Sequence, residues 1–163
     1  MCHVENYGLE VKIIDLLKRK NWYITTAESC TGGLIGATLV NVPGASKVFQ
    51  EGYITYSNEA KMKLLGVRSE TLERWGAVSE ETALEMAKGA ALAAGCQVGI
   101  SATGIAGPDG GTPEKPVGLV YIGCYIDGHQ SVLECRFCGS RLQNRESTVT
   151  NALELLYDEL TSF

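Results

Sequence analysis

Hydrophobic and polar positions along this chain follow two periods, one typical of helices and one typical of strands. Apolar residues recur at helical spacing in several stretches, and short runs rich in branched and aromatic residues lie between them. The predicted helices are residues 5–20, 34–40, 57–66, 69–74, 79–94 and 141–160. The predicted strands are residues 22–26, 49–56, 98–103, 118–125 and 130–137.

The order of these elements predicts an α/β fold, a three-layer α/β/α sandwich with a mixed parallel and antiparallel sheet. Asp127-Gly128 separates the last two predicted strands and is a strong hairpin signal, so these strands should pair antiparallel. The 163 residues suit a single core, and neither a repeat nor a linker divides them. We therefore expect one domain over residues 1–163.

Composition and charge argue against two classes of partner. The chain has a formal net charge of −5, and its one basic cluster, Lys18-Arg19-Lys20, falls at the end of a predicted helix, where it complements the helix dipole. No apolar run approaches the roughly 20 residues of a membrane span. Residues 1–6 are polar and acidic, unlike a secretory signal. We expect a cytoplasmic protein that binds neither nucleic acid nor membranes.

Cysteine and histidine usage disfavours metal chemistry. The six cysteines are scattered, and most lie in apolar surroundings, as small core residues do. Cys135 and Cys138 have CxxC spacing, but they fall in a predicted strand and at its end, and no second pair completes a zinc site. With only His3 and His129, a Ser-His-Asp triad is disfavoured as well.

Residues 26–33, Thr-Ala-Glu-Ser-Cys-Thr-Gly-Gly, form a predicted turn between the first strand and the second helix. A turn at a helix start presents free backbone N–H groups, which suit an anion or a developing negative charge. It also holds three candidate nucleophiles, Ser29, Cys30 and Thr31. The same residues equally fit a helix cap and a tight turn with no catalytic role.

A serine nucleophile needs a base, and no histidine is available to these motifs. A lysine can serve when its surroundings lower its pKa from about 10.4 toward neutrality. Lys61 is the candidate, because it lies in the first turn of a predicted helix, where the dipole also disfavours an ammonium. Tyr56 precedes that helix and could relay the proton, whereas Lys63 lies about 200° further round it. The alternative is that Lys61 is a solvated surface lysine.

A glycine-rich loop follows the third predicted strand. Residues 104–118 hold five glycines and three of the four prolines, and loops of this length are usually functional. Gly104 and Gly107 suit close approach of the backbone to a phosphate or a ribose. Arg141 and Arg145, one turn apart at the start of the last helix, could hold a phosphate between them. An inert connector and two exposed arginines are the alternatives.

Taken together, these motifs resemble the CinA C-terminal domain. They cover nearly the whole chain, in order and at consistent spacing, and several long motifs are far more specific than any one of them. The motifs are residues 26–33, 52–61, 76–79, 104–111, 115–118 and the Gly139-x-Arg141-x-x-x-Arg145 start of the last helix. The resemblance implies a three-layer α/β/α domain that is often dimeric, so we expect a homodimer.

The family includes stand-alone enzymes similar to nicotinamide mononucleotide (NMN) deamidases. The resemblance therefore implies conversion of NMN to nicotinate mononucleotide and ammonia, with no metal or other cofactor. By motif position, Ser29 would be the nucleophile, Lys61 the base and Tyr56 an assisting hydroxyl. Thr103 and Arg145 match positions linked to substrate binding and activity.

In the implied mechanism, Ser29 attacks the carboxamide carbon, and backbone N–H groups of residues 30–33 hold the oxyanion. Gly32 and Gly33 would let the backbone come close to the substrate. The substrate phosphate would lie with Arg141, Arg145 or the loop at 104–107. Two alternatives stay open: a non-catalytic nucleotide- or partner-binding module that keeps the fold, and a cysteine enzyme that uses Cys30.

Overall fold

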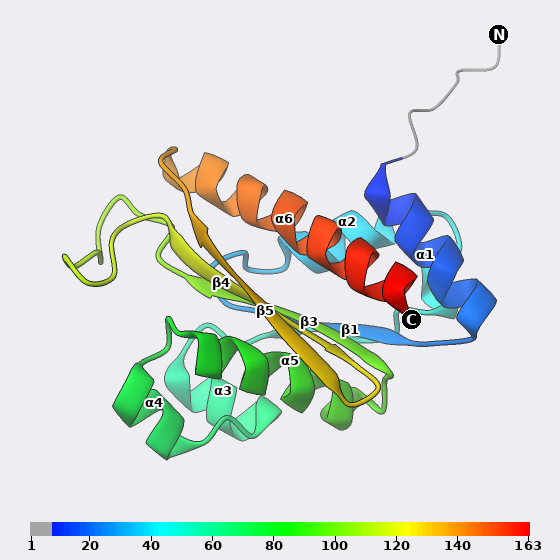
Figure 1. The fold of residues 1–163 in the computed structure, drawn as a ribbon, viewed down its shortest axis with the longest axis horizontal. Coiled ribbons are helices and arrows are strands. Elements are labelled where there is room, and N and C mark those ends of the chain that lie inside the picture. The colour runs from blue at the N-terminus through cyan, green and yellow to red at the C-terminus, as the bar shows by residue number, and fades with distance from the viewer. Residues whose placement is uncertain (1–7) are drawn as a thin grey trace, which may run out of the picture.

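The chain folds as a five-stranded mixed sheet between two layers of helices (Figure 1). The structure is a computed structural model that describes residues 8–163. Its strands are β1 (Ile24–Glu28), β2 (Tyr53–Ile54), β3 (Val98–Gly104), β4 (Leu119–Ile126) and β5 (His129–Arg136). Its α-helices are α1 (Leu9–Lys20), α2 (Leu34–Val40), α3 (Asn58–Leu65), α4 (Ser69–Trp75), α5 (Glu80–Ala94) and α6 (Arg141–Ser162). A short 3-10 helix spans Ala45–Lys47.

The strand order in the sheet is β2-β1-β3-β4-β5. β1 runs parallel to both β2 and β3, whereas β3, β4 and β5 pair antiparallel. Asp127 and Gly128 join β4 to β5 with positive φ values of 43° and 101°, the backbone that a tight hairpin favours. The predicted fold class, the mixed sheet and the hairpin are confirmed.

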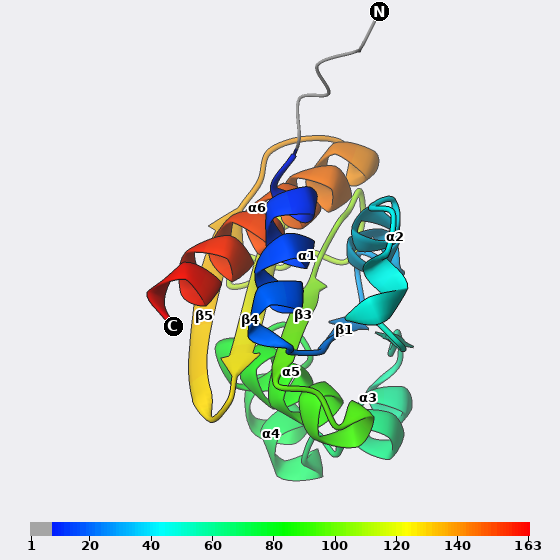
Figure 2. The same cartoon turned by 90° about the vertical axis from the view of Figure 1, so that its right-hand side faces the viewer.

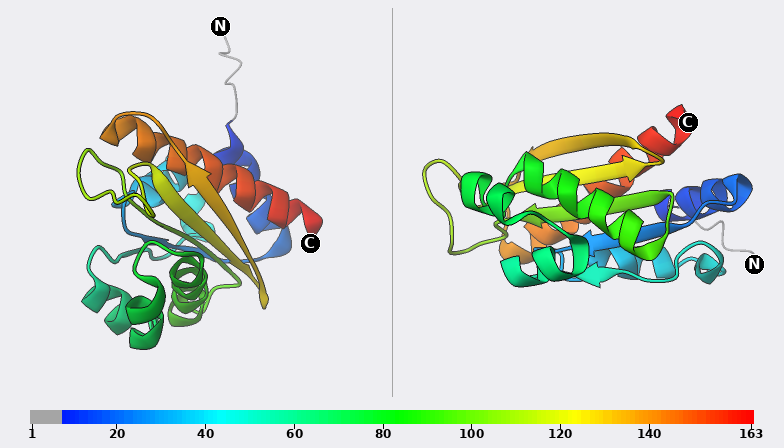
Figure 3. Two further views of the ribbon diagram at one scale, coloured as in Figure 1. Left: turned by 60° about the vertical axis from the view of Figure 1, so that its left-hand side comes forward. Right: turned by 90° about the horizontal axis from the view of Figure 1, so that it is seen from below.

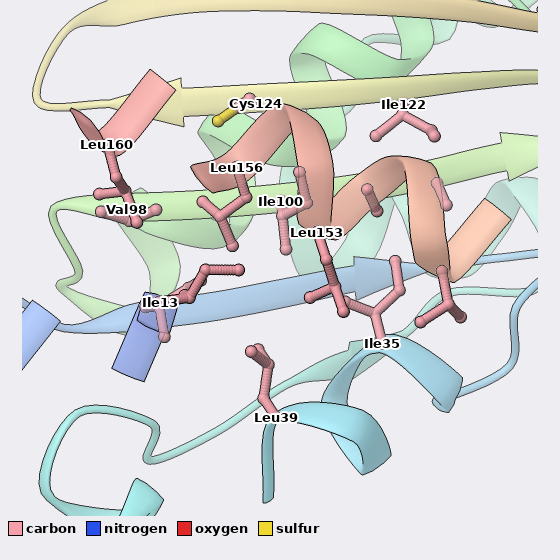
Figure 4. Close-up of a cluster of buried hydrophobic side chains, with 14 of the residues drawn as sticks. Ile13, Ile35, Leu39, Val98, Ile100, Ile122, Cys124, Leu153, Leu156 and Leu160 are labelled. Carbon is pink, nitrogen blue, oxygen red and sulfur yellow. The ribbon is translucent and has the colours of Figure 1, made fainter. Parts of the chain in front are cut away.

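The two helical layers separate clearly when the molecule is turned (Figures 2 and 3): α1, α2 and α6 cover one face of the sheet, and α3, α4 and α5 cover the other. The larger core lies under the first group, where side chains from α6 such as Leu153 and Leu156 meet Ile100 and Ile122 of the sheet (Figure 4). A smaller cluster around Met86 packs α5 against β1 and α3. β1 is therefore buried along its whole length.

Apart from the start of α1, the helices begin and end within two residues of their predicted positions. α1 corresponds to the helix predicted at 5–20, whose residues 5–7, like the polar start at 1–6, lie outside the described part of the chain. Ser79 caps α5 and Gly95 ends it, as expected. No helix within residues 8–163 is both long enough and apolar enough to cross a membrane.

The first strand differs from its prediction at residues 22–26, because β1 spans Ile24–Glu28. Its last three residues, Thr26, Ala27 and Glu28, pair in register with residues 100–102 of β3. Polar side chains can occupy a strand that is covered on both faces when their polar groups are paired, but hydrophobic periodicity does not mark them. The turn therefore begins at Ser29 and not at Thr26.

The second strand is much shorter than the predicted range of 49–56. Only Tyr53–Ile54 forms β2, and Phe49 makes an isolated bridge. Directly after β2, the N–H of Thr55 still donates to the carbonyl oxygen of Glu28, whereas the carbonyl oxygens of Thr55 and Tyr56 accept from the Nζ of Lys61. The segment after β2 is therefore held by β1 on one side and by Lys61 on the other.

Gly89 permits close packing of α5 on the end of α3. From this close packing we predict how a side chain at Gly89 changes stability. A Cβ atom at Gly89 would lie 1.9 Å from the carbonyl oxygen of Leu65, whereas one at Gly36 of α2 would meet no atom closer than 3.4 Å. Alanine in place of a helical glycine normally stabilises by up to ~1 kcal/mol. We expect Gly89→Ala to lower the free energy of unfolding by about 1–3 kcal/mol, and Gly36→Ala not to lower it. Urea unfolding followed by circular dichroism compares them, and equal effects would contradict the close packing.

Candidate active site

Lys61 is buried, with 1% of its surface exposed, and it is the largest fully buried side chain of the described residues. Its Nζ lies 3.1 Å from the Oγ of Ser29 and 2.8 Å from the carbonyl oxygen of Thr55. Ser57 caps α3 by accepting the N–H of Ala60, which sets the helix start that carries Lys61. Lys61 is therefore not a solvated surface lysine, and the structure brings it together with Ser29.

Burial lowers the pKa of Lys61 below its ordinary value, because the ammonium loses its hydration; Coulomb interaction with Cys30 acts in the opposite direction. Within residues 8–163, no carboxylate lies within ion-pair distance of the Lys61 amine. A neutral amine beside a hydroxyl can accept its proton. The pair formed by Ser29 and Lys61 can thus act as a nucleophile and its base.

Ser29 and Lys61 line a cavity of about 270 Å³. It lies where the parallel strands β1 and β3 end, and this edge of the sheet is on the left of Figure 1. Open α/β sheets bind ligands at such strand ends, and small-molecule sites usually measure about 300–1,000 Å³. The lining comprises Ser29, Cys30, Tyr56, Lys61, residues 77–78, residues 103–107, Asp109, Gly110 and Arg141. The cavity is therefore small and is bounded by five separate segments of the chain.

A larger depression, about 470 Å³, lies over α5 and the end of α3. Its lining includes an ion pair, Arg68 to Glu85 at 2.6 Å, but neither a nucleophilic hydroxyl or thiol nor a buried ionisable side chain. We therefore take the smaller cavity at Ser29 as the candidate active site.

The start of α6 holds the glycine-rich loop against the cavity. Arg141 donates from Nη1 to the carbonyl oxygen of Gly107 at 2.8 Å and from Nη2 to the hydroxyl of Tyr56 at 3.1 Å. Asn144, which is buried, donates from Nδ2 to the carbonyl oxygen of Ala106 at 3.0 Å. Two side chains of one helix thus fix the loop that follows β3.

The matching family model is the CinA C-terminal domain, and it covers residues 6–160. The chain belongs to the CinA C-terminal domain family. The CinA-like protein of Kosmotoga olearia is 55% identical to this CinA domain over 149 residues, which cover 91% of the chain and 36% of that protein. The chain spans 36% or 37% of the length of the first curated relatives that it matches.

Two solved structures share the fold. The competence/damage inducible protein CihA from Agrobacterium tumefaciens has a TM-score of 0.90 at 43% identity, covering 94% of this chain and 93% of that chain. A CinA superfamily protein from Klebsiella pneumoniae has a TM-score of 0.91 at 34% identity, covering 95% and 97%. The family that the motifs predict is therefore confirmed, together with its α/β fold.

The predicted site residues of this CinA domain fall into two groups. The cavity is lined by Ser29, Cys30, Tyr56, Lys61, Thr103, Gly104, Gly107 and Arg141. The residues placed outside its lining are Thr31, Gly32, Gly33 and Arg145. The second group consists of residues of the turn that carries Ser29 and of Arg145, which donates to two carbonyl oxygens of that turn.

The two glycines of the turn differ from expectation. Gly32 donates its N–H to the carbonyl oxygen of Ser29, and Gly33 donates to the carboxylate of Glu28. Their φ values of 59° and 102° are ones that other residues rarely adopt. These glycines serve the geometry of the turn, and their backbone is not at the cavity wall.

The structure does not bring Arg141 and Arg145 to one ligand, which corrects the predicted phosphate fork. The guanidinium of Arg145 donates to the carbonyl oxygens of Cys30 and Thr31, so it is committed to the turn, whereas Arg141 lines the cavity.

Cys30, the rival nucleophile, has a pKa raised to about 11, chiefly by burial, and a protonated thiol is a poor nucleophile.

The remaining site residues have defined contacts as well. The hydroxyl of Tyr56, a residue that is 63% exposed, is bonded to Arg141 and not to Lys61. Its assisting role therefore stays a prediction. Thr103 is buried at the cavity and donates its hydroxyl to the carbonyl oxygen of Ala77.

Sequence reasoning missed two residues that hold this site. Glu28 is 1% exposed, and its carboxylate accepts four hydrogen bonds from the turn and from the start of α2. The sequence did carry a signal for the role of Glu28, because an acidic residue stands directly before small polar residues and a predicted helix. Asn144 lies between Arg141 and Arg145 in the same motif, but no spacing rule distinguishes a buried helix asparagine from a solvated one.

The lowered pKa of Lys61 makes stability depend on pH. Between the folded pKa and the ordinary value of 10.5, the unfolded chain binds more protons, so the free energy of unfolding rises with pH. We expect the stability of the wild type to rise relative to Lys61→Met as pH increases from about 7 to about 10. Exposed Lys63→Met is the control and should follow the wild type. Urea unfolding across this pH range tests it, and parallel profiles for all three proteins would contradict the shift.

Proposed function

We propose that this domain is an amidohydrolase that converts NMN to nicotinate mononucleotide and ammonia, with Ser29 as nucleophile and Lys61 as base. The observation that supports it is the 3.1 Å approach of the Lys61 amine to the Ser29 hydroxyl at a cavity, with both residues buried. The choice of NMN rests on the resemblance to the deamidases of the family. The homodimer and the cytoplasmic location rest on resemblance and on composition.

In the proposed reaction, Lys61 takes the proton of the Ser29 hydroxyl as Oγ bonds to the carboxamide carbon, and the C=O electron pair moves to oxygen. Lys61 then gives the proton to the amide nitrogen, the C–N bond breaks, and ammonia leaves an ester on Ser29. Water attacks this ester as Lys61 takes its proton, and Lys61 returns that proton to the Oγ of Ser29 as the ester bond breaks and nicotinate mononucleotide leaves. The positive charge of the pyridinium ring favours attack on the carboxamide.

Arg141 is the arginine proposed to bind the substrate phosphate. It lines the cavity, and its two contacts, to Gly107 and Tyr56, leave further N–H donors for an anion. The backbone of residues 104–107 lies beside it in the cavity wall. Because Arg141 holds the Tyr56 hydroxyl, phosphate binding would release this hydroxyl for its proposed assistance to Lys61.

Loss of either member of the pair should abolish turnover. We expect Ser29→Ala and Lys61→Ala to lower kcat for ammonia release from NMN by roughly 10⁴-fold or more, and Lys63→Ala, an exposed control on α3, to keep it. A small primary amine added to Lys61→Ala should restore part of the activity. Wild-type activity in Ser29→Ala would overturn the mechanism. Binding of NMN without turnover by the wild type would favour a non-catalytic module.

Arg141 should set the preference for a phosphorylated substrate. We expect Arg141→Met to lower kcat/KM for NMN by about 10- to 100-fold, the worth of a hydrogen bond to a charged group, and to affect nicotinamide riboside much less. Arg136→Met on β5 is the matched control, because Arg136 is exposed and pairs with Glu134. Equal losses with both substrates would place the phosphate elsewhere.

A further inference from the structure

The turn after Ser29 leaves only part of its backbone available to a substrate. The N–H of Ser29 donates to Ala102, that of Gly32 to Ser29, and that of Gly33 to Glu28. Within residues 8–163, the N–H groups of Cys30 and Thr31 donate to no oxygen atom. These two residues directly follow the proposed nucleophile, and Cys30 lines the cavity.

The N–H groups of Cys30 and Thr31 belong to two peptide groups whose carbonyl oxygens are both hydrogen-bonded. The oxygen of Ser29, whose peptide group carries the N–H of Cys30, accepts the N–H of Gly32 at 3.1 Å. The oxygen of Cys30, whose peptide group carries the N–H of Thr31, accepts the Nε of Arg145 at 3.0 Å. In a trans peptide the N–H points away from the C=O, so each anchor directs an N–H the opposite way.

The positive charge of Arg145 also polarises the peptide groups of the turn. Its Nη2 donates to the carbonyl oxygen of Thr31 at 2.9 Å, so one guanidinium holds two successive carbonyls. A cation at the carbonyl end polarises a peptide group and makes its N–H a stronger donor. Arg145 comes from the second turn of α6 and lies outside the cavity lining, so it reaches the site only through this backbone.

Glu28 accepts the other N–H groups near Ser29 that could otherwise bind an oxyanion. Its buried carboxylate accepts the N–H groups of Gly33, Ile35 and Gly36 at 2.8–3.0 Å and the hydroxyl of Thr31 at 2.6 Å. Each amide it holds is unavailable to a substrate. The anion and the cation thus hold the turn together: Glu28 accepts its later N–H groups, and Arg145 donates to the carbonyl oxygens of Cys30 and Thr31.

We infer that the N–H groups of Cys30 and Thr31 form the oxyanion hole of the proposed reaction, and that Arg145 is a positioning residue that orients and polarises them. This inference rests on the proposed role of Ser29. It moves Arg145 from the substrate phosphate to the oxyanion of the transition state. Its loss should therefore lower kcat and leave KM nearly unchanged.

The test uses a fluorophosphonate, a probe that needs no knowledge of the natural substrate. Ser29 Oγ bonds to its phosphorus as the P–F bond breaks, fluoride leaves, and Lys61 takes the hydroxyl proton. The phosphoryl oxygen then occupies the oxyanion position. In ¹⁵N-labelled wild type, we expect the amide proton signals of Cys30 and Thr31 to move downfield on labelling, and that of Gly33 to stay.

Variants of Arg145 give the kinetic half of the test. We expect Arg145→Met to slow labelling of Ser29 and to lower kcat for NMN, each by about 10- to 100-fold. Arg145→Lys should recover part of both, because one ammonium can still reach a carbonyl. Arg136→Met is the control for loss of a charge. Circular dichroism verifies that each variant is folded.

The outcomes separate this inference from the proposed function. Labelling that depends on Arg145 without turnover of NMN would support the oxyanion hole and reject the substrate. Turnover of NMN with a raised KM, an unchanged kcat and unchanged labelling in both Arg145 variants would overturn the inference and leave the function standing. A wild type that neither labels at Ser29 nor turns over NMN would reject both.

Discussion

The burial of one amine organises the candidate active site. Lys61 is 1% exposed, and its Nζ is held by the Ser29 hydroxyl and by carbonyl oxygens of the segment after β2. A buried ammonium without a carboxylate partner is costly, so the site favours the neutral amine. The same contacts connect α3 to the segment after β2 and to Ser29 at the end of β1. Structure and proposed chemistry thus depend on the same hydrogen bonds.

The turn that carries Ser29 is supported from behind by a buried anion and a cation. Glu28 accepts the N–H groups at the start of α2, and Arg145 of α6 donates to the carbonyls of Cys30 and Thr31. Neither side chain lines the cavity. A backbone whose donors and acceptors are nearly all paired cannot rotate easily, so the amides that stay unpaired keep a fixed direction.

The sheet brings these parts to one place. β1 and β3 are adjacent and parallel, so the turn after β1 and the glycine-rich loop after β3 emerge at the same edge (Figure 1). The start of α6, near the C-terminus in sequence, also lies at this edge and contacts both segments. Arg141 and Asn144 bind the loop, and Arg145 binds the turn. The cavity lies between elements that are distant in sequence and has no counterpart in any single motif.

Local sequence determined the helices, the hairpin at Asp127-Gly128 and the α/β class, because periodicity and turn chemistry are properties of short stretches. The small number of histidines in the whole chain and the family motifs made Ser29 and Lys61 the candidate pair. Only the tertiary structure decided which polar groups meet. Arg141 and Arg145 share one face of a helix in sequence, yet one reaches the cavity and the other the back of the turn. The end of β1 likewise depends on residues 100–102 of β3, which lie far along the chain. Hydrogen bonding between distant segments leaves no period in the sequence, so these features could not be predicted from it.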